Sequence, residues 1–481
     1  MNFSMVIYIL GWILNLQAGF MMVPALTALI YGEKEGLCFV IIAAALLVIG
    51  IPCVLFKPKN RRMRAREGFV IVAFAWIILS LTGAIPYRVT GAVPTYVDAL
   101  FETVSGYTTT GASVLADAGA LNHCLDIWHC FTVWVGGMGI LVFMLAVLPL
   151  TGGNSLHIMR AESPGPVVGK ILPHMRDTAK ALYMIYIGLT LTEMVVLRIV
   201  GLSIFDSICM SFSNAGTGGF GVLSDGTMGY TAVQQIVLTV FMYVFAINFS
   251  IYFLILTGRI KDALKNEELR VYLGIVLIAV LTITFNIKSQ YNGSFGTALR
   301  HSAFQVATVT STTGYASTDF NTWPLLSKTL LVILMFMGAC AGSTCGGMKV
   351  SRYIIMTKNY FREMNSYVRP NRVHLVKMDG KRVDENTIRG VSNYFYAYIL
   401  FFAASLILIS IQNNTDLTTN FTAVTACLNN IGPGLGSVGP AASYIHLSNL
   451  QKVVLTVDML TGRLELYPIL VLGLPATWRK N

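Results

Sequence analysis

The sequence predicts an all-α membrane protein, on the basis of its composition and its apolar stretches. Of the 481 residues, 55% are hydrophobic and only 12% are charged, whereas soluble domains carry about 25% charged residues. A soluble fold of this length has too little interior to bury so much apolar surface. The 43 glycines are also typical of membrane helices, which pack closely through small residues.

Ten apolar stretches are long enough to cross the ~30 Å hydrocarbon core of a bilayer. They lie at 5–30, 36–56, 69–87, 127–150, 179–201, 233–257, 269–287, 325–357, 392–411 and 451–475. Four shorter segments between them cannot span a bilayer, so they predict re-entrant helices. These segments lie at 95–107, 203–215, 296–310 and 416–428.

After two leading helices, one order of elements occurs four times: a long span, a short re-entrant helix, a glycine-containing turn and a second long span. The turn glycines are Gly111, Gly219, Gly314 and Gly432. We therefore predict four pseudo-repeats in one chain, with ten spans and four pore helices. The predicted divisions are 1–68 for the leading helices and a basic loop, then 69–177, 178–268, 269–391 and 392–481 for the four repeats.

The basic residues indicate the orientation in the membrane. Of the 34 Lys and Arg residues, 26 lie in five connecting or terminal segments: 57–66, 151–180, 258–270, 349–390 and 479–480. With ten spans these segments share one side of the membrane, and the positive-inside rule makes that side cytoplasmic. Both termini are thus predicted to be cytoplasmic, and the net charge of +11 reflects topology rather than nucleic acid binding.

The longest basic connection, 358–391, is a candidate docking site for a soluble partner because of its length and charge. Within it, Asp379–Gly380 lies between Val-containing runs. An Asp-Gly pair in such a position is typical of a β-hairpin turn.

The turns after the four short helices carry the chemistry of the predicted site. Non-helical backbone survives at membrane depth only when it is buried in protein or faces a water-filled cavity. Four such turns around one axis form rings of carbonyl oxygens, which replace the hydration shell of potassium. Glycine fits because it adopts positive φ and has no side chain, and the negative ends of the short helices favour cations. The predicted filter comprises Thr109, Thr110, Gly111, Ala112, Thr217, Gly218, Gly219, Phe220, Thr312, Thr313, Gly314, Tyr315, Asn430, Ile431, Gly432 and Pro433.

The alternative for these segments is four glycine-rich surface loops on an unrelated transporter. Their matching positions, each between a short helix and a long span, favour the pore. In that pore we expect potassium to contact Thr109, Thr110, Gly218, Thr312, Thr313, Asn430 and Ile431.

Six stretches carry a resemblance to a known family. They are Ser105–Ser113 (SGYTTTGAS), Trp134–Ile140 (WVGGMGI), Thr310–Tyr315 (TSTTGY), Gly342–Arg352 (GSTCGGMKVSR), Asn430–Gly436 (NIGPGLG) and Gly462–Glu465 (GRLE). On these motifs, the chain resembles the Trk/Ktr/HKT superfamily of potassium transporters, specifically the membrane subunit of a bacterial Trk system. The resemblance covers nearly the whole chain, including the two leading helices of the Trk branch.

The resemblance implies potassium uptake across a bacterial plasma membrane by a homodimer in membrane lipid, each protomer with its own pore. It also implies a ring-forming cytosolic regulatory subunit that binds nucleotide, so ATP or NAD is expected only on that partner. Potassium is the transported ion, and no covalent cofactor is expected. In this family, glycine at the position of Gly111 is associated with potassium, whereas serine marks sodium-preferring relatives. The sequence departs from the family pattern at two places. One is the register of the second turn, Asn214–Phe220, and the other is Asp458 in the last span.

A gate is predicted where glycines interrupt the stretch 325–357. Broken helices are tolerated where they line a cavity, and the resemblance makes this segment an intramembrane gating loop below the filter. The alternative is a glycine-rich packing contact between helices. The predicted gate residues are Gly338, Gly342, Ser343, Thr344, Gly346, Gly347, Lys349 and Arg463.

An arginine near the middle of a span is energetically costly, so we expect Arg463 to form hydrogen bonds within the protein. The expected acceptors are loop carbonyls rather than Glu465. The resemblance implies that it projects below the filter, where its charge opposes cations. We predict that Arg463→Ala raises ion flux.

Other chemistry finds little support in the sequence. His123, Cys124, His129 and Cys130 match no standard zinc spacing. No nucleotide-binding or hydrolase motif occurs, which argues against a membrane enzyme. A purely structural scaffold is another alternative, and it predicts a protein that conducts no ions. Within transport, a sodium-permeable or cation-coupled relative is the alternative, and the sequence leaves open whether transport is channel-like or coupled.

Overall fold

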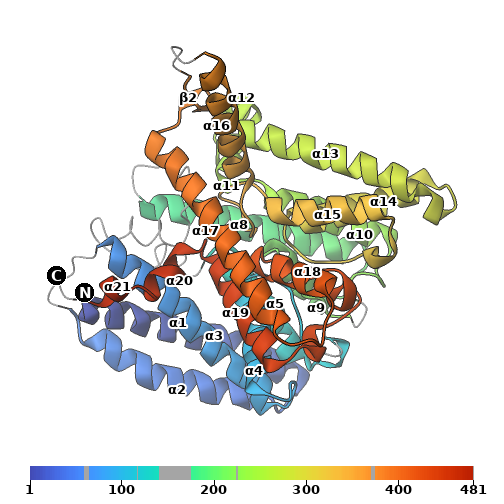
Figure 1. Cartoon of the computed structure of the whole chain (residues 1–481). Helices are drawn as coiled ribbons and strands as arrows, with labels where there is room; N and C mark the ends of the chain where they lie inside the picture. The colour runs from blue at the N-terminus through green and yellow to red at the C-terminus, as the bar shows by residue number, and fades with distance from the viewer. Residues whose placement is uncertain (59–63, 116–117, 140–174, 224–225, 370–373, 480–481) are drawn as a thin grey trace.

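The structure, a computed structural model, describes residues 1–481 except 59–63, 116–117, 140–174, 224–225, 370–373 and 480–481. The described chain is predominantly helical (Figure 1). Its helices include α1 (Phe3–Tyr31), α2 (Gly36–Leu55), α3 (Ala65–Val89), α5 (His123–Gly137), α8 (Met175–Ile199), α10 (Ala232–Ala246), α13 (Glu267–Ile287), α15 (Leu325–Met337), α16 (Val350–Val368), α17 (Glu385–Ser410) and α19 (Asn449–Arg463). The others are α4 (Tyr96–Tyr107), α9 (Ile204–Ala215), α11 (Phe249–Leu256), α12 (Ile260–Lys265), α14 (Phe295–Thr310), α18 (Leu417–Leu428), α20 (Tyr467–Leu472) and α21 (Pro475–Trp478).

The outer helices present apolar faces that a soluble protein would have to cover. In α2, Leu37, Val48 and Leu55 are each about two-thirds or more exposed. Among the described residues, six helices are long and apolar enough to cross a membrane, or seven if the bent pair α10–α11 counts as one. The chain is therefore a multi-pass helical membrane protein, as predicted.

Four short helices, α4, α9, α14 and α18, lie close to the segments where the sequence predicts short helices. Three of them begin at a capping side chain. The hydroxyls of Thr95, Ser203 and Ser294 accept hydrogen bonds from the backbone N–H three residues on, at 3.1, 3.0 and 3.4 Å. Such caps satisfy one of the unpaired N–H groups at a helix start and fix where each helix begins.

The helices that follow these short ones end early. Helices α5, α10 and α19 have 15 residues each and α15 has 13. The stretches 233–257 and 451–475, each predicted as one span, are both interrupted in the structure. The first bends by 90° between α10 and α11, and the second breaks where Glu465 and Leu466 adopt positive φ. The predicted interruption within 325–357 is present as a non-helical segment between α15 and α16, and the end of 127–150 lies outside the described residues.

Both ends of the chain approach the same side of the molecule. The Asn2 N–H donates to Glu67 Oε1 at 3.3 Å. Arg66 donates to the carbonyls of Ala476 and Arg479 at 3.4 and 3.3 Å. The first residues, the start of α3 and the C-terminal segment are thus neighbours.

The connection after α16 contains the predicted hairpin. Strands β1 (Lys377–Met378) and β2 (Lys381–Arg382) pair antiparallel, and Asp379 and Gly380 between them have φ of 49° and 76°. Positive φ at both central residues is the requirement of a type I′ turn. Val376 and Met378 pack against Ile355, Ile388 and Val391, so the hairpin is fixed against α16 and α17.

Candidate ion-binding ring

The turns after α4, α9, α14 and α18 share one backbone conformation. Thr109, Thr217, Thr312 and Asn430 have φ of 55°, 56°, 54° and 55°, and the glycine two residues later has φ between 68° and 94° in each turn. This equivalence sets the register of the second turn at Thr217–Phe220. A left-handed threonine costs roughly 1–2 kcal/mol, so the surroundings must hold these turns in place.

Backbone hydrogen bonds explain how each short helix leads into its turn. The N–H groups of Thr109, Thr217, Thr312 and Asn430 donate to the carbonyl three residues earlier. The next N–H in each turn donates to the carbonyl five residues earlier, at 2.8–3.0 Å. These bonds satisfy helix carbonyls but leave others open: no described residue donates to the carbonyls of Thr110, Gly218, Thr313 or Ile431.

The glycine positions show that the four turns close a ring in chain order. A Cβ on Gly111 would lie 2.2 Å from the carbonyl oxygen of Gly218 in the second turn. The corresponding distances are 2.1 Å from Gly219 to Thr313, 2.2 Å from Gly314 to Ile431 and 2.6 Å from Gly432 to Thr110. Each turn therefore contacts the next, and the fourth contacts the first. No side chain fits at these positions, and four carbonyls without donors lie at the four contacts.

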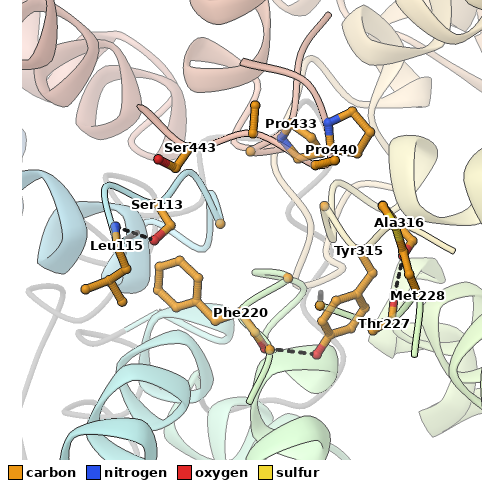
Figure 2. A pocket seen from close by; sticks show the side chains of 18 of the residues that line it. Ser113, Leu115, Phe220, Thr227, Met228, Tyr315, Ala316, Pro433, Pro440 and Ser443 are labelled. Atoms are coloured by element: carbon orange, nitrogen blue, oxygen red, sulfur yellow. Dashed lines mark hydrogen bonds between the residues drawn. The ribbon is translucent and has the colours of Figure 1, made fainter. Parts of the chain in front are cut away.

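A cavity of about 580 Å³ borders the ring, and all four ring glycines line it. Its walls include residues 439–444 and 226–228, and the Tyr315 hydroxyl donates to the backbone carbonyl of Phe220 at 3.4 Å (Figure 2). Tyr444 donates to the Gly432 carbonyl at 2.6 Å and so supports the fourth turn. Among the described residues lining the cavity, none is Asp, Glu, Lys or Arg. Backbone and hydroxyl dipoles and the His129 imidazole face the cavity.

The predicted gating loop, which the structure extends to 338–349, packs directly against two of the turns. The Gly346 N–H donates to Thr312 Oγ1 at 2.7 Å, and a Cβ on Gly346 would lie 2.6 Å from the Asn429 carbonyl. Gly338, Gly342 and Gly347 have φ of 68°, 76° and 74°, so glycine is required for this path. Predicted gate residues Ser343 and Thr344 lie in the same loop, where the Ser343 hydroxyl donates to the Cys340 carbonyl at 2.6 Å.

Arg463, the last residue of α19, donates to carbonyls from two distant segments. It reaches the Thr344 carbonyl at 2.7 Å and the Gly136 and Gly137 carbonyls, at the end of α5, at 2.6 Å each. The structure thus brings Arg463 to the loop 338–349. Lys349, whose φ is 71°, donates to the Cys345 carbonyl within the loop.

Glu465 has a separate partner. It forms a buried ion pair with Arg352 of α16, whose guanidinium also lies 4.0 Å from the centre of the Tyr394 ring. This pair joins the helix after the loop to the segment that follows Arg463.

Glu102 of α4 is a supporting residue that the sequence reasoning missed. It is fully buried and accepts hydrogen bonds from the Ser113 hydroxyl at 2.9 Å, the Val114 N–H at 2.8 Å and His129 Nε2 at 2.7 Å. It therefore fixes the segment that leaves the first turn. The signal in the sequence was an ionisable residue in an apolar membrane segment, which is a functional candidate by default.

Asp98 and Asp458 are two further buried acidic residues. Asp98 of α4 pairs with Lys452 of α19 at 2.6 Å, joining the first and last quarters of the chain. Asp458 accepts a hydrogen bond from Ser405 at 2.6 Å, and its Oδ2 has no partner among the described residues. No basic neighbour pairs with Asp458 in the described part of the chain.

The His and Cys residues at 123–130 have separate structural contacts. His123 Nδ1 lies 2.9 Å from Glu33 Oε1, and the His123 and Cys124 N–H groups donate to the same carboxylate. His129 instead bonds to Glu102 and stacks on Phe220, with ring centres 3.4 Å apart. In the parts of the chain that the structure describes, no three His, Cys, Asp or Glu residues are placed to hold a metal ion together.

Comparison with known proteins identifies the family. The family model described as "TrkH: Cation transport protein" matches residues 38–479. The chain belongs to the TrkH family. It is 35% identical over 490 residues to the Trk system potassium uptake protein TrkH of Salmonella typhimurium and 36% identical over 490 residues to that of Vibrio parahaemolyticus, with both chains fully covered in each case. The crystal structure of the potassium transporter TrkH from Vibrio parahaemolyticus matches with a TM-score of 0.89 at 33% identity, again over the whole of both chains.

Proposed function

We propose that this chain takes up potassium across a bacterial plasma membrane, with the ring of four turns as its selectivity filter. The closure of the ring carries the proposal. Each ring glycine lies against a carbonyl of the next turn, at a distance that excludes any side chain. Rings of backbone carbonyls replace the water around a potassium ion. As members of a transport family, the relatives named above are transporters rather than enzymes.

Potassium enters the ring from the neighbouring cavity, whose described lining contains no Asp, Glu, Lys or Arg. The C-terminal ends of α4, α9, α14 and α18 point into the four turns, so their dipoles favour a cation there. Ligands for the ion come from Thr109, Thr110, Gly218, Thr312, Thr313, Asn430 and Ile431. Gly111 in the first turn fits the potassium-preferring pattern of the family.

The loop 338–349 and Arg463 act as the gate on the far side of the ring. The loop is bonded to the third turn through Gly346 and Thr312. Arg463 adds a positive charge held by three carbonyls. At about 8 Å, such a charge repels a potassium ion by roughly 2 kcal/mol at an effective dielectric constant near 20. Loop and charge together therefore oppose passage until both are displaced.

In the membrane, the chain adopts the two leading helices and four pore repeats predicted above, with ten spans and four pore helices. Both termini lie in the cytoplasm, and the neighbouring contacts of Asn2, Arg66 and Ala476 agree with this arrangement. The chain works as a homodimer with a nucleotide-binding regulatory subunit on its cytoplasmic side. The relatives are described as parts of a Trk system, which supports such a partner.

The proposal is tested by uptake of radioactive rubidium into liposomes that contain the purified protein and a potassium gradient. We expect uptake that external potassium inhibits and sodium does not. Equal inhibition by sodium would favour the sodium-permeable alternative. Uptake that required a sodium or proton gradient would favour coupled transport. Absence of uptake from correctly inserted protein would contradict the proposal.

A further inference from the structure

The intramembrane loop is held at both of its ends by one buried carboxylate on another element. Glu268 Oε1, at the start of α13, accepts a hydrogen bond from the Ala341 N–H at 2.8 Å and from the Ser351 N–H at 2.9 Å. Ala341 lies within the loop, and Ser351 lies in the first turn of α16. Glu268 is only 3% exposed, so water does not compete for these bonds. The position of Glu268 therefore sets the position of the loop.

The residue before it, Glu267, is bound to the hairpin. Asp379, in the hairpin turn, accepts a hydrogen bond from the Glu267 N–H at 2.7 Å and returns one from its own N–H to Glu267 Oε2 at 3.3 Å. Asp379 also accepts from Asn266 Nδ2 at 3.3 Å. A carboxylate at a helix N-terminus satisfies an otherwise unpaired N–H and is stabilised by the helix dipole. The hairpin turn thus fixes the first residue of α13.

A lysine of α16 binds both Glu267 and the hairpin. Lys358 pairs with Glu267 Oε1 and donates to the Lys377 carbonyl of β1 at 2.8 Å. The helix that follows the loop, the hairpin and the start of α13 therefore meet at Glu267. Figure 1 shows β2, α12 and α16 together at one end of the molecule, next to the end of α13.

We propose that Glu267 and Glu268 form a relay that couples the cytoplasmic hairpin to the intramembrane loop. Glu267 receives the displacement of the hairpin turn, and Glu268, on the same helical turn, transmits it to Ala341 and Ser351. The inference rests on the proposed function, because it assigns a regulatory input to the predicted gate. Among the exposed charges of the hairpin and the residues just after it, Asp379 binds the start of α13 and Glu385 pairs with Arg362. The exposed Lys377, Lys381 and Arg382 therefore outnumber Asp384, so the input comes from an acidic surface of a soluble partner.

The relay predicts different effects for two kinds of substitution at Asp379 and at Glu268. Asp379→Ala removes the acceptor for the Glu267 N–H, whereas Asp379→Asn keeps an oxygen there. Glu268→Ala releases both loop N–H groups, whereas Glu268→Gln keeps an acceptor. Asp384, also exposed in this connection and without a side-chain bond to the helix that it precedes, provides the matched control Asp384→Ala.

The experiment measures two quantities for each variant in liposomes. One is rubidium flux, and the other is the rate at which N-ethylmaleimide modifies Cys345, read by the mass of its peptide. Cys345 lies in the loop and is buried, so its modification reports loop release. We expect Asp379→Ala to raise both quantities about fivefold, the ratio for one lost hydrogen bond, and Glu268→Ala, which releases two N–H groups, to raise them about 25-fold. Asp379→Asn, Glu268→Gln and Asp384→Ala should stay near the wild type.

The double variant Asp379→Ala with Glu268→Ala distinguishes a relay from two local effects. In a relay, the double variant has the same rubidium flux and the same Cys345 modification rate as Glu268→Ala alone, because Glu268 lies downstream of Asp379. Multiplied effects, or a Cys345 rate unchanged by Asp379→Ala, would overturn the relay. The flux comparison requires wild-type protein that transports rubidium. Absence of flux in the wild type would instead count against the proposed function, while the Cys345 rates would still test the relay.

Discussion

The strongest consequence of ring closure concerns Gly314. In Gly314→Ala, the new Cβ would lie 2.2 Å from the Ile431 carbonyl oxygen. Ordinary contact begins near 3.4 Å, so the oxygen or its turn must move by at least 1.2 Å (3.4 − 2.2). The alanine would also be held at φ of 89°, at a cost of roughly 1–2 kcal/mol. If that energy is lost from potassium binding, affinity falls about 5–30-fold.

The assay is the permeability ratio of potassium to sodium, measured from reversal potentials of the reconstituted variant. We expect the ratio to fall by about tenfold, since one carbonyl of the ring no longer matches the potassium ion. Gly188→Ala in α8 is the matched control, because a Cβ there meets nothing within 4 Å. An unchanged ratio in correctly inserted Gly314→Ala protein would refute the reasoning that this carbonyl is a ligand.

Three further predictions concern the residues around the ring. Arg463→Ala should raise rubidium flux by up to roughly thirtyfold, the rate equivalent of about 2 kcal/mol of removed repulsion; Arg463→Lys should raise it less, and equal flux in both variants would argue against a role for the charge. Glu102→Ala should lower the potassium-to-sodium ratio and the melting temperature, because it leaves the Ser113 and Val114 donors unpaired at about 1–3 kcal/mol each; retention of both properties would contradict its supporting role. Lys452→Met should destabilise the protein by about 3–5 kcal/mol by leaving Asp98 buried and unpaired, whereas the double variant with Asp98→Leu should recover most of the loss in a denaturation assay.

The turns themselves were predictable because their chemistry is local. Each has Thr or Asn two residues before a glycine, directly after a short apolar helix, and the structure has the same left-handed φ at each. The register of the second turn was not predictable, because Thr217–Gly218–Gly219 offers more than one glycine for the ring position. Only the backbone angles and the contact between Gly219 and Thr313 place it.

The breaks in α10–α11 and after α19 were not predictable for a different reason. Ile247–Asn248 contains neither glycine nor proline, the usual signals of an interrupted helix. At the second break, Pro468 lies in the first turn of α20 and not at Glu465–Leu466, where the backbone turns. The first break is stabilised by tertiary contact, since the Phe249 N–H donates to the Gly342 carbonyl at 3.0 Å. The second follows the buried pair of Glu465 with Arg352, which lies 113 residues away in the sequence.

The partners of the charged residues also depend on the tertiary fold. Arg463 was expected to bond to loop carbonyls, and the Thr344 carbonyl is one of them. Its contacts with Gly136 and Gly137 lie more than 300 residues away, and no local pattern indicates them. Glu268 precedes an apolar stretch like many helix-start carboxylates, so its bonds to Ala341 and Ser351 become visible only in three dimensions.

The most direct test of the central claim is the reversal potential of the wild-type protein in a planar bilayer with potassium on one side and sodium on the other. With the two salts at equal concentration, a ring of backbone carbonyls that replaces the hydration shell of potassium predicts a reversal potential far from zero, with the potassium-containing side negative. A reversal potential near zero, with measurable current in both directions, would show that the ring does not select potassium over sodium and would contradict the account.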